Sequence, residues 1–152
     1  MLKISKNASL TVSIILTLVF FAILIGAAFI MPGFVRIIGG AALRPLEQGD
    51  VVLILVVGYI VLGFAMLADY LLLRLLLRVR GGEVFTDRSV ALIRGVSWCA
   101  FVIAICFLLM SRYYLVALVL AFTAALLGVS LRVVKNVIEQ ATAIKAENDL
   151  TV

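Results

Sequence analysis

The chain has 152 residues, of which 66% are hydrophobic and 14% are charged, and its formal net charge is +5. Soluble domains hold about 45–50% apolar and about 25% charged residues. So few charged side chains could not cover the apolar surface that a soluble fold of this chain would have. The composition excludes a soluble globular domain, a disordered chain and a small disulfide scaffold, and it indicates a protein whose main solvent is lipid.

The residue types that carry most enzyme chemistry are scarce. Histidine is absent, and the two cysteines, Cys99 and Cys106, lie in one apolar run. Without histidine there is no imidazole base near neutral pH and no histidine ligand for zinc or haem. The helical rise separates the two cysteines by about 10 Å, which is too far for a disulfide. We therefore expect no cofactor, no metal site and no enzyme activity.

The basic residues flank apolar segments and form no run interleaved with exposed aromatic side chains. This distribution is typical of charges at the edges of a membrane, and it argues against direct binding of nucleic acid. The lipid bilayer is thus the first partner that the sequence predicts.

The first apolar segment predicts a transmembrane helix over about residues 8–31. No charge lies between Lys6 and Arg36, and about 20 apolar residues span the hydrocarbon core of a bilayer. A cleaved signal peptide is the competing interpretation, but the apolar stretch exceeds the ~7–15 residues of a signal sequence, which favours a retained helix. We expect Pro32 and Gly33 to end or kink this helix.

A glycine-rich loop leads from there to the second helix, predicted over about residues 51–80. This helix would measure about 45 Å, longer than a hydrocarbon core of about 30 Å, so its last turns should leave the membrane. Gly81 and Gly82 provide its stop.

The third helix is predicted over residues 86–111, with Thr86 as its N-cap, and the fourth over residues 114–146. Only a short link separates them, so they form an antiparallel hairpin. The predicted fold class is an all-α integral membrane protein, a single membrane domain over residues 1–152 with four transmembrane helices.

The positions of lysine and arginine orient this four-helix bundle. If both termini are cytoplasmic, ten of the thirteen basic residues lie inside, and only Arg36, Arg44 and Arg112 lie outside. Such an asymmetry follows the positive-inside rule. We expect a multi-pass protein of the bacterial cytoplasmic membrane, with its second and fourth helices extended into the cytoplasm. Small-residue pairs such as Ala124 with Gly128 predict close contacts between helices within the bundle. The alternative is that these pairs form contacts between two copies of the chain in a homo-oligomer.

Asp69 is an acidic residue embedded in an otherwise apolar run. An acidic group inside a membrane indicates a functional site by default, but Asp69 would lie about 27 Å along the second helix, near the inner edge of the hydrocarbon core. Three interpretations are open: a structural ion pair with Arg74 or Arg132, a proton or cation site, or simple exposure at the interface.

Beyond Leu131 the fourth helix becomes amphipathic. We expect Val133, Val137 and Ile138 to pack inward, while Glu139 meets an arginine of the extended second helix. The last six residues have no evident packing need, which favours binding of a partner. The residues of the loop before the third helix are those of an ordinary helix start. Two of them are nonetheless candidates for partner binding, together with the last six residues. These candidates are Glu147, Asn148, Asp149, Leu150, Thr151, Val152, Phe85 and Arg88.

Two segments carry a family resemblance: GGEVFTDRSVALIRGVSW at residues 81–98 and AIKAENDLTV at residues 143–152. With these segments the chain resembles, over nearly its whole length, a bacterial family of small four-helix membrane proteins catalogued as domain of unknown function 2975. Members of that family look like partners of small helix-turn-helix regulators of the Cro/repressor type. The resemblance implies regulation by a membrane protein, and it brings no catalytic residues.

Two functions follow as hypotheses. The first is an integral membrane regulatory or scaffolding protein whose cytoplasmic face binds a soluble partner, a small helix-turn-helix transcriptional regulator. The alternative is a small transporter or channel that uses Asp69. The neighbouring genes distinguish the two hypotheses. A short reading frame for a helix-turn-helix protein beside this gene would favour regulation, and an efflux operon would favour transport.

Overall fold

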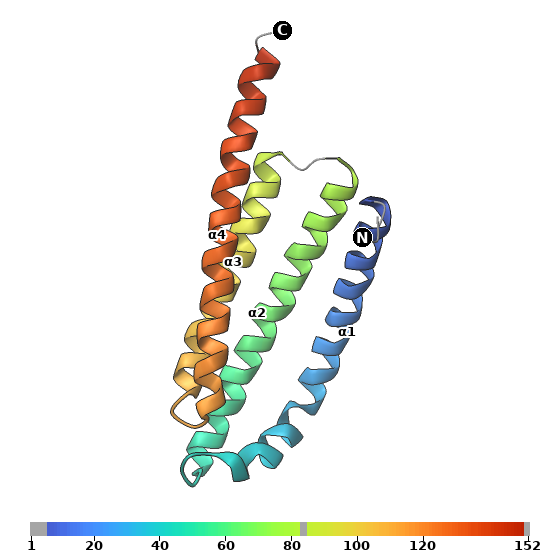
Figure 1. The fold of residues 1–152 in the computed structure, drawn as a ribbon. Coiled ribbons are helices and arrows are strands. Elements are labelled where there is room, and N and C mark those ends of the chain that lie inside the picture. The colour runs from blue at the N-terminus through green and yellow to red at the C-terminus, as the bar shows by residue number, and fades with distance from the viewer. Residues whose placement is uncertain (1–5, 83–84, 151–152) are drawn as a thin grey trace, which may run out of the picture.

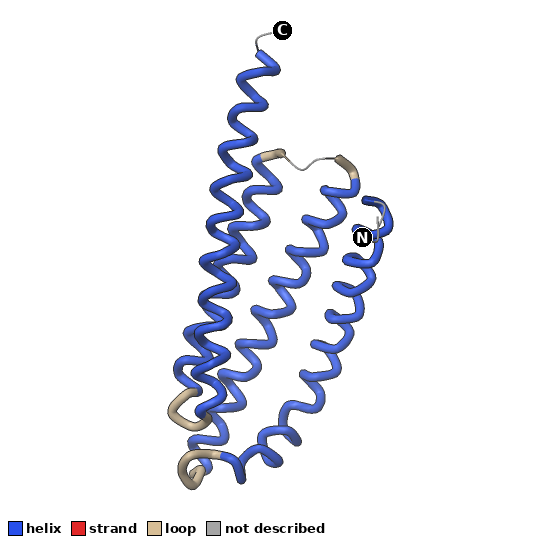
Figure 2. The backbone as a smooth tube through the Cα atoms, viewed as in Figure 1, coloured by secondary structure: helices blue, strands red, loops and turns tan. Residues whose placement is uncertain are grey.

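Four long helices make up the computed structural model, which describes residues 6–82 and 85–150. The described elements are α1 (Lys6–Ile38), a short 3-10 turn η1 (Gly39–Ala41), α2 (Gln48–Arg80), α3 (Asp87–Met110) and α4 (Leu115–Leu150), as Figure 1 shows. Helices and loops account for all of these residues (Figure 2). Each of the four helices is long and apolar enough to cross a membrane, which is typical of a multi-pass membrane protein.

The helices pack in the order of the sequence. In the described part of the chain, α2 packs against α1, α3 against α2, and α4 against α3, while no close backbone approach joins α1 to α3 or α4. Successive helices run in opposite directions, so α1 begins, α2 ends, α3 begins and α4 ends at one end of the molecule (Figure 1). We call this end the termini end, and the end with η1 and the α3–α4 link the loop end.

A glycine lies at each helix interface. A Cβ atom at Gly58 would clash with Met31 of α1, one at Gly95 would lie 2.8 Å from Cδ1 of Leu71, and one at Gly128 would lie 3.1 Å from Cε1 of Phe101. Close approach of this kind is how helices associate in lipid, where apolar burial supplies little driving force. The prediction of a close contact at Gly128 is therefore confirmed.

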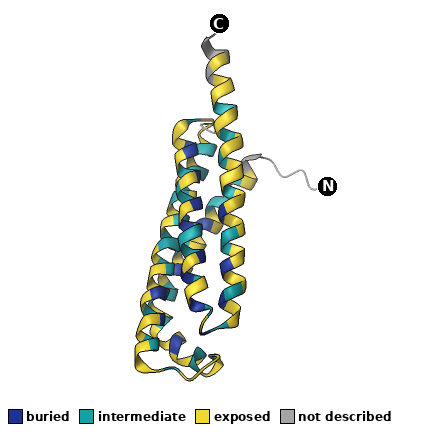
Figure 3. Cartoon of the chain, turned by 90° about the vertical axis from the view of Figure 1, so that its left-hand side faces the viewer, coloured by how far each residue is buried: buried dark blue, intermediate teal, exposed yellow. Residues whose placement is uncertain are grey.

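The outer faces of the helices remain apolar. Large hydrophobic side chains stand exposed along all four helices, and the exposed residues cover their outer surfaces in Figure 3. A water-soluble monomer rarely exposes large hydrophobic side chains along the full length of every helix, whereas helices that face lipid do.

A polar network holds the loop end together. The carboxylate of Asp50 accepts hydrogen bonds from the Tyr113 hydroxyl at 2.8 Å and from the Glu47 backbone N–H at 3.2 Å, and it pairs with Arg44 at 2.9 Å. The Arg44 guanidinium also lies 5.0 Å from the centre of the Tyr113 ring. The bond from Asp50 to the backbone N–H of Glu47 caps α2. Because of this cap, α2 begins at Gln48, three residues before the predicted start.

The first helix continues past Pro32, where the sequence predicted that it ends or kinks. It runs through Pro32 to Ile38, and Val35 beyond the proline is 2% exposed in the core of the loop end. Pro32 has no N–H, so the carbonyl of Ala28 loses its partner four residues on. The Tyr59 hydroxyl of α2 donates to that carbonyl at 3.2 Å. A neighbouring helix thus supplies the missing donor, and the predicted boundary at residue 31 is wrong.

This compensation predicts a coupling between Tyr59 and Pro32. Tyr59→Phe should lower the free energy of unfolding by about 1 kcal/mol, because it leaves the Ala28 carbonyl unsatisfied. In a Pro32→Ala background the same change should cost close to nothing, since the backbone N–H gained at position 32 reaches that carbonyl. Unfolding of the full chain by titration with denaturing detergent in mixed micelles measures both values.

Tyr70→Phe is the matched control, because Tyr70 also lies on α2 with an exposed ring. It should cost little in either background. Equal losses from Tyr59→Phe with and without Pro32 would show that the hydroxyl does not compensate for the proline.

Candidate functional site

The turn between α2 and α3 forms at the termini end as the sequence predicted. Gly82 adopts a positive φ of 83°, which glycine tolerates at the end of a helix. Thr86 is the N-cap of α3, and its side-chain oxygen accepts the Ser89 backbone N–H at 3.3 Å. The Ser89 hydroxyl lies 3.0 Å from that same oxygen and is buried. These contacts fix where α3 begins.

The predicted partner-binding residues divide between this turn and the end of α4. Phe85 and Arg88 are exposed, as a surface contact requires. Helix α4 continues to Leu150 instead of ending near residue 146, so the first part of the tail is helical. Glu147 is exposed there. Asn148, Asp149 and Leu150 belong to the helix by their backbone, and Thr151 and Val152 lie outside the described residues.

Polar contacts join one side of α4 to α3. The Ser97 hydroxyl donates to the Gly128 carbonyl at 2.8 Å in a buried position. Further along, Glu139 pairs with Arg94 of α3 at 3.7 Å and with Lys135 on its own helix. The Arg94–Glu139 pair is exposed on both sides, so water screens it and it adds little to stability. These contacts nonetheless set the rotation of α4, because they all require the same side of the helix to face α3.

An aromatic platform on α3 strengthens this rotation. The guanidinium carbon of Arg132 lies 5.1 Å from the ring centre of Trp98 and 5.5 Å from that of Phe101. The two rings pack edge to face, with centres 6.3 Å apart. Cation–π contacts of this kind stabilise an arginine that leaves an apolar segment.

The apolar side of the α4 extension therefore faces away from the bundle. Val133 is 57% exposed, and Val137 and Ile144 are each 60% exposed. We call these three residues the α4 apolar face. The prediction that Val133 and Val137 pack inward is wrong, because the polar side of α4 takes the contacts with α3. Glu139 meets an arginine, as predicted, but the arginine is on α3 and not on α2.

The α4 extension also projects beyond its neighbours. In Figure 1 the last turns of α4 continue past the α2–α3 turn, with no other helix beside them. The α4 apolar face thus runs from the edge of the bundle toward the free end of the helix.

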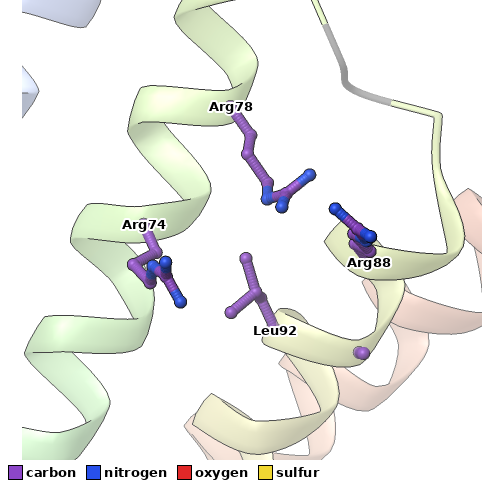
Figure 4. Close-up of a pocket in the computed structure, with 5 residues that line it drawn as sticks. Arg74, Arg78, Arg88 and Leu92 are labelled. Atoms are coloured by element: carbon purple, nitrogen blue, oxygen red, sulfur yellow. The ribbon is translucent and has the colours of Figure 1, made fainter.

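Three arginines line a pocket between α2 and α3 at the termini end. The pocket has a volume of about 430 Å³ and is lined by Arg74, Arg78, Arg88, Ala91 and Leu92. In Figure 4 the guanidinium groups of Arg78 and Arg88 point toward one another across the gap between the helices, with Leu92 below them. The side chains that line the pocket carry positive charge and apolar surface.

Asp69 lies buried in α2 with 6% of its surface exposed. Neither arginine proposed as its partner pairs with it: Arg74 lies over the ring of Tyr70 at 5.7 Å, and Arg132 lies over Trp98. Among the residues that the structure describes, no hydrogen bond or ion pair involves the Asp69 side chain. The interpretations as an ion pair with these arginines and as an interfacial, exposed residue are therefore wrong, which leaves the proton or cation site open.

The acidic and sulfur-containing side chains do not gather into a metal site. Within residues 6–82 and 85–150, no three of the histidine, cysteine, aspartate and glutamate type lie close enough to hold a metal ion. The two cysteines are free thiols buried in α3.

The family model described as "Protein of unknown function (DUF2975)" matches residues 10–152. The chain belongs to the DUF2975 family. No curated protein and no solved structure matches it. The resemblance stated from the two sequence segments is thus confirmed, and the match covers all the features described above. The arginine pocket, Asp69 and the α4 apolar face all lie inside the DUF2975 region.

Proposed function

We propose that this member of the DUF2975 family is a regulatory or scaffolding protein of the bacterial cytoplasmic membrane that holds a soluble partner at its inner face. In this proposal both termini are cytoplasmic, and the partner binds the α4 apolar face. The α4 apolar face is the single observation that carries the proposal. Burial of an exposed apolar row on a projecting helix is a common mode of protein recognition.

Lipid covers the first part of this face, because Val133 lies about 27 Å along the helix axis from Leu115, but it does not extend to Ile144. Counted from Leu115, the first residue of α4, Val137 lies about 33 Å and Ile144 about 44 Å along the helix axis. A hydrocarbon core is about 30 Å thick, so Ile144 lies about 14 Å beyond it if α4 crosses the membrane directly. An apolar side chain that stands exposed at that distance favours burial against a protein.

The family resemblance supports the nature of the partner. It implies a small helix-turn-helix transcriptional regulator, which would be kept from or delivered to DNA according to its contact with the membrane protein. The backbone of α4 continues as a helix to Leu150, with Glu147 exposed, and Phe85 and Arg88 lie exposed at the same end of the molecule. The proposed binding surface therefore combines the α4 extension with the α2–α3 turn.

Substitution on the α4 apolar face tests the proposal. Ile144→Asp should weaken binding of the helix-turn-helix regulator that the family resemblance implies by about tenfold or more, because a charge replaces an apolar contact. The measurement is the affinity between the purified regulator and the full-length membrane protein in lipid nanodiscs.

Ala143→Asp is the matched control, because it adds the same charge to the neighbouring exposed residue on another side of the helix. It should leave the affinity nearly unchanged. Equal affinity of the wild type and Ile144→Asp would place the partner elsewhere, and the absence of any binding by the wild type would reject the proposed partner.

The orientation of the protein is a separate prediction. A C-terminal fusion to a reporter that is active only in the cytoplasm should be active, because ten of the thirteen basic residues then lie inside. The control is a fusion to a reporter that is active only outside the cytoplasm. Activity of that second reporter would reverse the topology and remove the proposed partner surface from the cytoplasm.

Transport is the second candidate function, because Asp69 is a buried carboxyl group without a partner among the described residues. Such groups in membrane helices commonly mark ion or proton pathways. If Asp69 serves transport, Asp69→Asn should abolish proton flux in proteoliposomes and leave the free energy of unfolding unchanged or higher, since no bond is lost. Asp50→Asn is the control, and it should lower that free energy, because it weakens the bonds to Arg44 and Tyr113. No flux by the wild type would exclude this function.

A further inference from the structure

We propose that the arginine pocket between α2 and α3 is a binding site for the phosphate-bearing headgroup of an anionic phospholipid. The pocket is lined by Arg74, Arg78, Arg88, Ala91 and Leu92. It shares Arg88 with the proposed partner surface but no residue with the α4 apolar face, so variants of Arg74 and Ile144 distinguish a failure of this proposal from a failure of the proposed function.

The chemistry of the lining fits a phosphate group. A guanidinium presents several N–H donors in a planar fork that matches phosphate oxygens, and it keeps its charge at all accessible pH values. Arg74 and Arg78 are four residues apart and share one face of α2, while Arg88 approaches from the first turn of α3 (Figure 4). Arg74, Arg78 and Arg88 thus offer guanidinium donors from two helices to one volume of about 430 Å³.

The depth of the pocket fits a lipid headgroup. Counted from Val51, which follows the last charge at the loop end of α2, Arg74 lies about 35 Å and Arg78 about 40 Å along the helix. The hydrocarbon core is about 30 Å thick and the headgroup layer adds about 5–8 Å on each side. The guanidinium groups therefore lie at or just outside the layer that holds the lipid phosphates.

The apolar part of the lining fits a lipid better than a free anion. Ala91 and Leu92 form the side of the pocket contributed by α3. They offer no hydrogen-bond donor, and they lie on the helix that continues into the apolar span. A phospholipid would place its phosphate among the arginines and its glycerol and first acyl carbons against these two residues. Basic pockets between transmembrane helices are known to hold anionic headgroups in this way.

Titration of the full-length protein with single lipids tests the site. In neutral detergent, native mass spectrometry should give an affinity for phosphatidylglycerol about tenfold higher than for phosphatidylcholine with the same acyl chains. Arg74→Gln and Arg88→Gln should each weaken the binding of phosphatidylglycerol by about tenfold, the loss expected for one charge-assisted hydrogen bond. Equal affinity for the two lipids would overturn the proposal.

Arg80→Gln is the matched control, because it removes the same charge from the same end of α2 and Arg80 does not line the pocket. It should change the affinity by less than about twofold if the site is specific. An equal loss with Arg80→Gln would overturn the proposal, because net charge alone would then explain the binding. Inorganic phosphate added at equal concentration should not displace the lipid, and displacement would assign the pocket to a free anion instead.

Lysine variants keep the test informative if a glutamine variant does not accumulate. Arg74→Lys with Arg88→Lys retains both charges but loses the planar fork of the guanidinium. This double variant should fold and should bind phosphatidylglycerol several-fold more weakly than the wild type. Unchanged affinity would overturn the assignment of these arginines to the headgroup.

Discussion

Close approach of helix backbones is the constraint on which the whole arrangement depends. In lipid, an apolar side chain gains little by moving from hydrocarbon to a helix interface, so the helices are held by dense packing and by hydrogen bonds between them. Each interface accordingly has a glycine with a large side chain of the neighbouring helix on it. The three pairs are Gly58 with Met31, Gly95 with Leu71, and Gly128 with Phe101. The same closeness lets Ser97 reach the Gly128 carbonyl and Tyr59 reach the carbonyl that Pro32 leaves free.

The rotation of α4 follows from this constraint and decides which surfaces are left for function. Once Gly128 lies against Phe101, the polar side of α4 meets α3 at Arg94 and Trp98. The apolar side must then face outward along a helix that continues beyond its neighbours. At the same end, the α2–α3 turn brings arginines from two helices to one pocket. Packing inside the bundle thus determines both of the surfaces that we connect with binding.

The sequence predicts those features that depend on local composition, and it fails where a distant residue decides. The four apolar spans, the N-cap at Thr86 and the close contact at Gly128 follow from residue types and their spacing. The continuation of α1 through Pro32 could not be predicted, because its compensation comes from Tyr59, 27 residues away. The early start of α2 had a local signal, a carboxylate at Asp50 three residues after Glu47, which the charge pattern alone did not reveal. The inward direction assigned to Val137 was wrong, because periodicity identifies an apolar side but not the neighbour it faces.

The packing of each helix on its sequence neighbours has a consequence for how the protein is made. Because no described contact of helix backbones joins α1 to α3 or α4, each helix can pack on its sequence neighbour, and only loop-end contacts such as those of Val35 and Asp50 wait for Tyr113. Topologies dominated by contacts between neighbouring segments assemble quickly, since each loop closed is short. Each hairpin can therefore form as soon as its second helix has left the ribosome, in the order in which the chain is synthesised. The Tyr59 hydroxyl then bonds to the Ala28 carbonyl in the first hairpin, so the acceptor that Pro32 leaves free has a partner before the last two helices are made.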